Sequence, residues 1–196
     1  MTNHSKFAFS RGFTLIELMV TVSIAAILMT VAVPSFTSFR RNAELTSVAN
    51  KFISSVNAAR GEAMKRGMSA VVVPLDNGPS WDAGWAAFVD KTRLLTYDPA
   101  AEGTVATQPK VPPGITITAN GTAANADPYI MFDASGFSKD TANAPSAMTF
   151  HIRRNDVSAA NQPDQTRFVV ISMTGRVRVC RPISASDANC GTSSTQ

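Results

Sequence analysis

A long apolar run lies near the start of the chain. From Phe13 to Val33 the sequence is apolar apart from scattered Thr and Ser residues, and Glu17 is its one charged residue. As a helix, this run would be about 31 Å long, which is close to the hydrocarbon thickness of a bilayer. The pattern therefore predicts a membrane-spanning helix segment over residues 13–33.

After Pro34 the apolar positions recur on one side of a helix. They follow steps of three and four residues, with polar residues between them, at Leu45, Val48, Phe52, Val56, Ala59 and Ala63. Gly67, preceded by two basic residues, is a typical helix stop. Pro34 removes one backbone hydrogen bond and is expected to bend the helix without ending it. We predict one helix of about 80 Å from Phe13 to Arg66, whose second half, residues 34–66, packs on a domain.

Downstream of Gly67 the period changes from helical to alternating. Short segments rich in Val, Ile, Thr and aromatic residues are separated by turn formers. Strands are predicted at Ala70–Val73, Gly84–Val89, Leu94–Tyr97, Ile115–Ala119, Tyr129–Phe132, Met148–Arg153, Arg167–Ser172 and Arg176–Cys180. Long loops are predicted at Asp98–Pro113 and Asn155–Gln165. The fold class is therefore α+β, with a long N-terminal helix packed on a small antiparallel β-sheet or a two-sheet domain over residues 67–196.

The residues before the apolar run carry Lys6 and Arg11. Basic residues favour the cytoplasmic side of a membrane, so residues 1–12 are expected to stay there. A secretory signal is cut after its apolar segment. A cut at Gly12-Phe13, before the run, would instead leave the apolar helix on the mature chain.

Glu17 needs a partner if it lies within a bilayer. A carboxylate in a spanning helix costs roughly a few kcal/mol at the bilayer centre. A cut before Phe13 would create a new α-amine near the depth of Glu17, and the amine of a neighbouring subunit could pair with the carboxylate. The alternative is an interfacial glutamate whose side chain reaches the lipid headgroups.

The segment Gly12-Phe13-Thr14-Leu15-Ile16-Glu17, followed by an apolar helix and Pro34, resembles the class III leader of type IV pilins and type II secretion pseudopilins. The resemblance implies that a prepilin peptidase cuts after Gly12 and methylates the new N-terminal Phe13. It also implies that Glu17 assists docking onto the growing filament.

Three further segments are similar to GspH/FimT-type minor pilins and pseudopilins. They are Ala59-Arg60-Gly61-Glu62-Ala63, Gly84-Trp85-Ala86-Ala87-Phe88 and Gly175-Arg176-Val177-Arg178-Val179-Cys180. This resemblance implies a single-pass protein of the bacterial inner membrane. Its long helix packs on a β-rich domain exposed to the periplasm, and it is incorporated into a pilus or pseudopilus.

Composition agrees with an exported globular domain. The chain is 44% hydrophobic and 16% charged, and its formal charge of +4 falls to about +2 without Lys6 and Arg11. Cys180 and Cys190 are the two cysteines, and an even count with short spacing favours a disulfide in an exported domain. Such a bridge should stabilise the fold by roughly 2–3 kcal/mol. The alternative is a pair of free thiols, which needs a reducing compartment; zinc is disfavoured because no histidine lies nearby.

The sequence gives little support to an enzyme, and no cofactor is expected. His151 is the one histidine after the leader, and in an alternating pattern it is expected to be a packed or surface residue. No nucleophile elbow, phosphate loop or HExxH motif occurs. Asp76, Asp82 and Asp90 lack EF-hand spacing and are interpreted as solvated loop acids rather than metal ligands. The two tryptophans, Trp81 and Trp85, are expected in the core or at an interface.

The Gly175-Arg176-Val177-Arg178 unit is a candidate anion site. In a strand, Arg176 and Arg178 would point to one face and the intervening valine to the other. Arg181 continues the positive run and Arg167 is expected to join it, and guanidinium groups suit phosphate oxygens. In some relatives a GRxR unit contacts DNA during natural transformation, so the resemblance places this role on Arg176 and Arg178. The alternatives are an edge strand kept soluble by charge, or a basic patch that meets acidic neighbours.

Two functions follow from these observations. The first is structural: a minor pilin or pseudopilin of a type IV pilus or type II secretion pseudopilus that helps initiate or cap assembly. Its expected partners are other pilin or pseudopilin subunits, the prepilin peptidase and inner-membrane lipid. The second is a DNA-binding minor pilin that acts in natural transformation through the C-terminal arginines, with DNA as a further partner.

Overall fold

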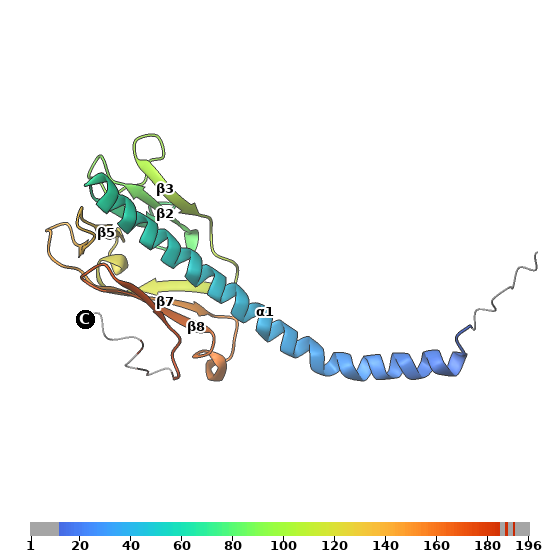
Figure 1. Ribbon diagram of the computed structural model, residues 1–196. Coiled ribbons are helices and arrows are strands. Elements are labelled where there is room, and N and C mark those ends of the chain that lie inside the picture. The colour runs from blue at the N-terminus through green and yellow to red at the C-terminus, as the bar shows by residue number, and fades with distance from the viewer. Residues whose placement is uncertain (1–11, 185–186, 188–189, 191–196) are drawn as a thin grey trace, which may run out of the picture. The chain divides into compact units, whose positions relative to one another are not determined.

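The computed structural model describes residues 12–184, 187 and 190. The chain divides into two compact units, residues 1–40 and Arg41–Gln196, and each is described by itself. The first unit contains the N-terminal part of helix α1 (Leu15–Arg66). The second contains the rest of this helix and two antiparallel sheets, as Figure 1 shows.

Helix α1 ends at Arg66, as its sequence predicts, but it starts two residues after the predicted Phe13. It begins at Leu15, where Thr14 acts as the cap because its side-chain oxygen accepts the N–H of Glu17 at 3.2 Å. It runs through residue 34 without a break and ends at Arg66. Gly67 then adopts a φ of 63°, and the N–H of Met68 bonds to the carbonyl of Ala63 at 3.2 Å. This is the left-handed C-terminal cap that favours glycine.

The strands form two separate sheets, which resolves the predicted choice in favour of the two-sheet domain. The first sheet has the order β3-β2-β1-β5-β6, with β1 (Ala70–Pro74), β2 (Trp85–Val89), β3 (Gly103–Gln108), β5 (Ile130–Phe132) and β6 (Ser138–Lys139). The second has the order β4-β7-β8-β9, with β4 (Ile115–Ala119), β7 (Met148–Arg154), β8 (Thr166–Ile171) and β9 (Val177–Cys180). Three short 3-10 helices, η1 (Trp81–Ala83), η2 (Gly121–Ala124) and η3 (Ala159–Asn161), lie in the connections. The α+β class is therefore confirmed.

One predicted strand and one predicted loop are wrong. Leu94–Tyr97 is not a strand, because Arg93 and Leu95 have positive φ angles of 61° and 56° that an extended strand does not contain. The predicted loop Asp98–Pro113 contains β3, which pairs with β2 at the edge of its sheet. An edge strand is partly exposed and needs little apolar alternation, so its sequence gave no signal. The two-residue strand β6 was also missed.

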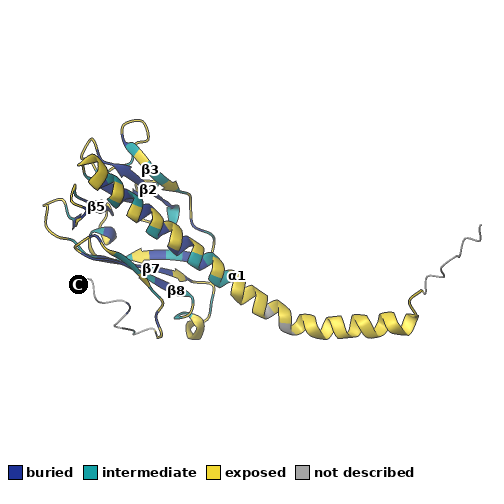
Figure 2. Ribbon diagram, viewed as in Figure 1, coloured by how far each residue is buried: buried dark blue, intermediate teal, exposed yellow. Residues whose placement is uncertain are grey.

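The core lies between the helix and both sheets. The predicted apolar stripe from Leu45 to Ala63 is buried, and it packs against residues of β2 and β7 in one cluster (Figure 2). The ring of Phe52 is central: its centroid lies 4.6 Å from Phe150 of β7 and 5.0 Å from Trp85 of β2, and it also contacts Trp81. Both tryptophans were expected in the core or at an interface, and the structure places both in the core.

A charged cluster fastens the helix to the second sheet. The buried guanidinium of Arg154, at the end of β7, donates to Glu44 of the helix at 2.7 Å and to both oxygens of Asp156 at 2.8 and 2.9 Å. Arg41 lies 3.8 Å from Asp156. The hydrogen bond from Arg154 lowers the pKa of Asp156, and the bond to Asp156 raises the pKa of Arg154 despite burial. Because the charges balance, the buried guanidinium is not left uncompensated.

Replacing Phe52 with Ala tests whether this ring is the centre of the core. We expect the free energy of unfolding of the full chain in detergent to fall by about 3–5 kcal/mol, because a buried aromatic ring is removed and a cavity remains. Urea unfolding followed by circular dichroism measures it. Phe39→Ala is the control, because Phe39 is 69% exposed and lies outside the core cluster. Equal losses in the two variants would contradict this view of the core.

The depressed pKa of Asp156 predicts a specific acid dependence. A carboxylate whose pKa is lower in the folded state stabilises the fold above its unfolded pKa, about 3.9, and this contribution is lost as the pH falls through the folded value. Asp156→Asn should therefore cost stability at pH 7 and progressively less below about pH 4. Urea midpoints measured between pH 7 and pH 2 give the difference. Asp127→Asn, at an exposed carboxylate, is the control and should keep the acid dependence of the wild type. If the difference in stability between Asp156→Asn and the wild type stayed constant with pH, the linkage would be refuted.

Candidate functional site

The first unit exposes a continuous apolar surface. Its large apolar side chains are exposed from Phe13, at 78%, to Phe39, at 69%, and Figure 2 colours this part of the ribbon as exposed. An exposed apolar surface of this extent marks contact with lipid or with other protein. Among the described residues, no single helix is long and apolar enough to cross a membrane. The two parts of α1 on either side of its bend, Leu15–Thr30 and Ser35–Arg66, together have the length and composition that a span needs.

The hydroxyl groups of this segment leave its surface apolar. Thr21, Ser23, Thr30 and Thr37 each donate to a backbone carbonyl three or four residues earlier, at 2.7–3.0 Å. These side chains therefore satisfy their hydrogen-bonding capacity inside the helix. Lipid or apolar side chains around the helix therefore need not provide hydrogen-bond acceptors for these hydroxyl groups.

Glu17 is the exception on this surface. It lies in the first turn of α1, and its side chain is exposed. Its backbone N–H donates to the side-chain oxygen of Thr14 at 3.2 Å. Among the described residues no cation forms an ion pair with it. Gly12 and Phe13 precede it, while Lys6 and Arg11 lie outside the described residues. The described part of the chain therefore shows an exposed carboxylate in the first turn of α1 with no ion pair.

The structure does not place all four arginines of the proposed patch on the surface. Arg167 is only 8% exposed, and its guanidinium donates to the carbonyls of Asp164 and Thr166 and to side-chain oxygens of Asn42 and Thr46 on the helix. Burial lowers its pKa, and the charge of Arg181 adds to this effect. The expectation that Arg167 joins an exposed patch is therefore wrong: it anchors the helix to β8.

The remaining arginines lie at the edge strand β9. Arg181 pairs with Asp164 at 2.8 Å, and both side chains are exposed. Arg178 stands opposite Val170, on the face away from the helix, whereas Val177 stands opposite Ile171 of the core and packs against it. The predicted division of faces is confirmed for these two residues. Arg176 is exposed but precedes the strand, which begins at Val177 rather than at the predicted Arg176.

Arg60 makes a structural contact that the sequence did not identify. From the helix, its Nε donates to the carbonyl of Gly136 at 2.8 Å and its Nη2 to that of Thr174 at 3.1 Å. It therefore joins the β5–β6 turn of one sheet to the β8–β9 turn of the other. A Cβ on Gly175 would lie 2.0 Å from the carbonyl oxygen of Gly136, so the close approach requires glycine there. The Ala59–Ala63 segment was the only signal for this contact.

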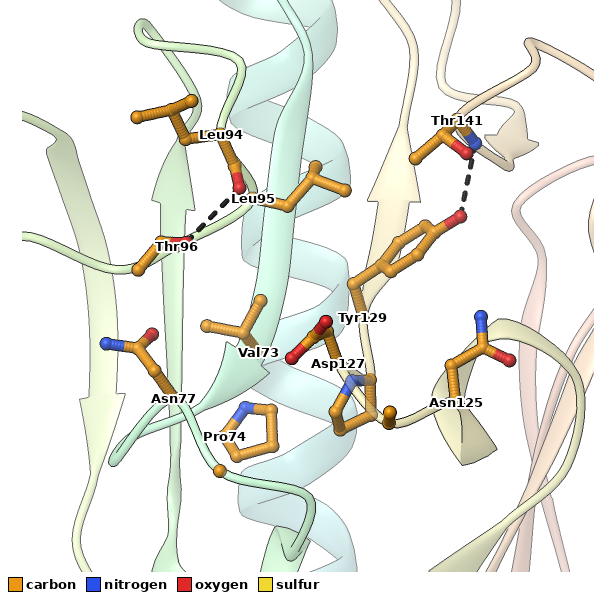
Figure 3. A pocket seen from close by; sticks show the side chains of 13 residues that line it. Val73, Pro74, Asn77, Leu94, Leu95, Thr96, Asn125, Asp127, Tyr129 and Thr141 are labelled. Carbon is orange, nitrogen blue, oxygen red and sulfur yellow. Dashed lines mark hydrogen bonds between the residues drawn. The ribbon is translucent and has the colours of Figure 1, made fainter.

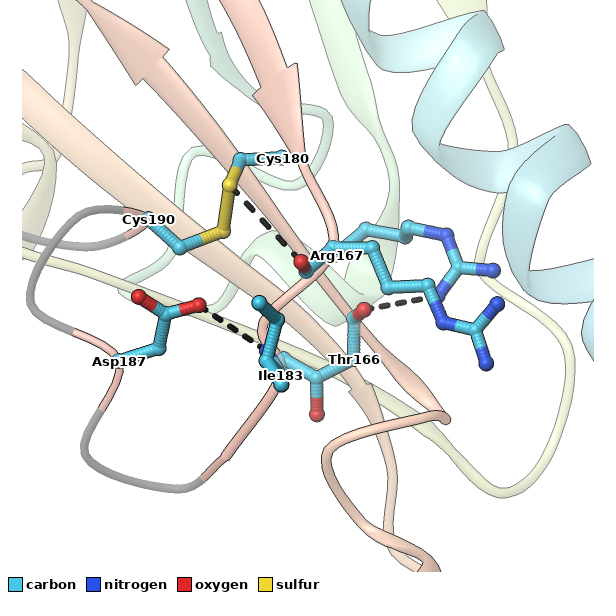
Figure 4. Close-up of a disulfide and its surroundings, with 7 residues drawn as sticks. Thr166, Arg167, Cys180, Ile183, Asp187 and Cys190 are labelled. Atoms are coloured by element: carbon cyan, nitrogen blue, oxygen red, sulfur yellow. Dashed lines mark hydrogen bonds between the residues drawn. A yellow bond between two sulfur atoms is a disulfide. The ribbon is translucent and has the colours of Figure 1, made fainter.

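The predicted disulfide between Cys180 and Cys190 is confirmed (Figure 4). It joins the end of β9 to Cys190, which is fully buried. Between them, the N–H of Ile183 donates to the carboxylate of Asp187 at 3.0 Å, and Cys190 donates to the carbonyl of Asp187 at 3.2 Å. The bridge therefore ties Cys190 to the end of β9 in the second sheet.

The candidate acids and the histidine have structural partners. Asp82 accepts the N–H of Ile117 at 2.6 Å, and Asp90 is buried, with its pKa raised first by that burial. These two were wrongly expected to be solvated loop acids; Asp76 is exposed and accepts the N–H of Gly78. The ring of His151 packs 4.3 Å from that of Phe168, and burial followed by the charge of Arg153 lowers its pKa. No group of three potential metal ligands occurs among the described residues.

A hollow of about 520 Å³ lies on the face of the first sheet away from the helix (Figure 3). Leu94 and Leu95 line one side, and Asp127 and Tyr129 line the other. The hydroxyl of Tyr129 accepts the N–H of Thr141 at 3.1 Å. Asp127 is its only charged lining residue, so the hollow offers neither a nucleophile–base pair nor a set of metal ligands.

Comparison with known proteins identifies the family. The prokaryotic N-terminal methylation motif matches residues 8–33, and the type II transport protein GspH matches residues 48–175. The chain is 46% identical over 43 residues to "Prepilin peptidase-dependent protein D" of Escherichia coli (strain K12), a match covering 22% of this chain and only 30% of that relative.

Solved structures agree on the fold. Two crystal forms of the Pseudomonas aeruginosa (strain PAO1) type IV minor pilin FimU match with TM-scores of 0.55 and 0.52 at 20% identity. The matches cover 74% and 71% of this chain and 98% of that one. Because the GspH match spans more than half of the 196 residues and the methylation motif precedes it, the chain belongs to the GspH family of structural pilins and pseudopilins.

Proposed function

We propose that this chain is a minor subunit of a type IV pilus or type II secretion pseudopilus that helps initiate or cap assembly. One observation carries the proposal: the helix before Arg41 exposes its apolar side chains, while the second unit has a complete core of its own. The exposed segment needs a cover that this chain does not provide. Lipid of the bacterial inner membrane serves as that cover before assembly, and the helices of neighbouring subunits serve as it afterwards.

The chemistry at the N-terminus supports the same proposal. Cleavage by a prepilin peptidase after Gly12 and methylation of Phe13 would leave a cationic amine one turn from Glu17. The exposed carboxylate of Glu17 then pairs with the amine of a neighbouring subunit, because a charge in an apolar surrounding is stable only when it is compensated. In this arrangement residues 13–33 span the membrane once and the second unit lies in the periplasm.

The DNA-binding hypothesis loses two of its four residues. Arg167 is buried against the helix and Arg181 is paired with Asp164. The proteins that match this chain are described as pilins, a peptidase-dependent protein and a type II transport protein, which gives no support to DNA binding. DNA capture stays a prediction confined to Arg176 and Arg178, and the structural role is the function we propose.

The first test is the mass of the mature chain isolated from cells. We expect it to begin at Phe13 and to carry one methyl group on the new amine. Intact-mass and N-terminal peptide spectrometry measure this, with a strain that lacks the prepilin peptidase as the control, in which residues 1–12 remain. A mature chain that begins well beyond Val33, or a working filament whose subunits still carry the leader, would overturn the proposal.

The second test removes the docking acid. Glu17→Ala should strongly reduce the number of assembled filaments or the amount of secreted protein, because the amine of the neighbouring subunit loses its counter-charge. The second unit should unfold at the same urea concentration as in the wild type, since this unit begins at Arg41 and does not contain Glu17. Glu62→Ala, which removes an acid from the same helix within the second unit, is the matched control. Normal assembly with Glu17→Ala would rule out the docking role.

A further inference from the structure

A groove beside the helix is lined by a tryptophan whose buried indole N–H has no acceptor among the described residues. This groove, of about 300 Å³, lies between one side of α1 and the segment that follows β3. The helix contributes Val48 and Lys51, the following segment contributes Lys110 and Val111, and Trp85 belongs to β2. Trp85 is 2% exposed, and its Nε1 is buried with no acceptor among the described residues.

The other buried tryptophan, Trp81, does have an acceptor for its indole N–H. Trp81 packs against the same ring of Phe52, yet its Nε1 donates to the carbonyl of Ala123 at 2.9 Å. Buried donors in folded proteins nearly always have an acceptor. The indole of Trp85 is therefore the exception in a core whose other tryptophan follows the rule.

The far wall of the groove is held in place by the fold. Gly84, with a φ of 98°, allows the segment after β3 to pass closely, since a Cβ there would lie 2.2 Å from the carbonyl oxygen of Gln108. The N–H of Val111 then donates to the carbonyl of Asp82 at 3.0 Å. Because backbone contacts already hold this wall on both sides, ligand binding does not have to supply the free energy of ordering it.

The charges at the groove favour an anion. Lys51 and Lys110 are exposed, and neither has an ion-pair partner among the described residues. Glu44 also lines the groove, but its carboxylate is neutralised by Arg154 at 2.7 Å. Two uncompensated ammonium groups therefore remain beside a floor formed by Val48, Trp85 and Val111.

We propose that this groove binds an acidic side chain, next to an apolar one, from a neighbouring polypeptide subunit. The carboxylate accepts from the indole N–H of Trp85 and lies between the two ammonium groups, while the adjacent apolar side chain covers the valines. A volume of about 300 Å³ is at the lower end of ligand pockets and suits one or two residues of a chain. The identity of the partner as a filament subunit rests on the proposed function; the chemistry of the groove does not.

The test is a titration of the full-length, ¹⁵N-labelled chain in detergent with two blocked peptides, acetyl-Leu-Glu-amide and acetyl-Leu-Gln-amide. The chain has two tryptophans, so it gives two indole N–H resonances, and Trp81→Phe assigns them. We expect the acidic peptide to move the Trp85 proton downfield, as a new hydrogen bond does, and to leave the Trp81 proton in place. The neutral peptide should bind much more weakly.

Charge variants separate specific binding from general attraction. Replacing Lys51 and Lys110 together with Gln should weaken the acidic peptide about fivefold, the effect of losing two partly exposed ion pairs. Lys139→Gln is the control, because Lys139 lies on β6 at the opposite edge of the first sheet from β3. Trp85→Phe should also weaken binding, whereas Trp81→Phe, an equal truncation in the same core, should not.

Three results would overturn the inference: no shift of the Trp85 proton at millimolar peptide, equal binding of the two peptides, or equal effects of the lysine variants and the control. A shift that follows the protein concentration without any peptide would assign the groove to a second copy of this chain and would also overturn it. None of these results depends on filament assembly. Failure here therefore leaves the proposed function standing, and failure of the Glu17 test leaves the titration interpretable.

Discussion

The structure depends on one helix that must satisfy two different surroundings. From Leu45 to Ala63 it buries a single apolar stripe against both sheets, with Phe52 at the centre. Before Arg41 it carries exposed apolar side chains on all sides, and its hydroxyl groups donate to carbonyls of the helix itself. A helix that is apolar all round is stable only in lipid or among other helices, whereas a one-sided stripe belongs at a domain surface. The change of pattern along α1 therefore divides the molecule into an anchoring part and a folded part.

Hydrogen bonds from three arginines fix the orientation of the helix against the sheets, which apolar packing alone does not. Burial of the stripe is non-directional, so alone it would tolerate small rotations of the helix against the sheets. Arg60 fixes one end through the carbonyls of Gly136 and Thr174, while Arg154 and Arg167 fix the other end through Glu44 and Asn42. Hydrogen bonds from a planar guanidinium are strongly oriented and match paired acceptors. Each of the three side chains thus connects the helix to strands or turns far away in the sequence.

The sequence predicted those features that depend on local periodicity. The helix, its stop at Gly67, the core stripe and most strands of both sheets follow from steps of three and four residues or from alternation. The strand β3 did not, because an edge strand such as Gly103–Gln108 is half-exposed and buries little of what a pattern can show. The role of Arg167 was also out of reach: alternation gives the face of a side chain, but its acceptors Asn42 and Thr46 come from a helix more than 120 residues earlier. Contacts between distant segments leave no periodic trace in a single sequence.

The same reasoning limits what a short motif can prove about DNA binding. In Gly175-Arg176-Val177-Arg178, the glycine is required because a Cβ would meet the carbonyl of Gly136, where Arg60 joins the two turns. Val177 packs partly against the core, and Arg178 lies on the outer face of an edge strand, where a charged side chain discourages pairing with another chain. Only Arg176 has no structural reason in the fold beyond its backbone bonds to Ser172. Since packing alone accounts for most of the motif, its presence in this chain carries little weight for nucleic-acid recognition.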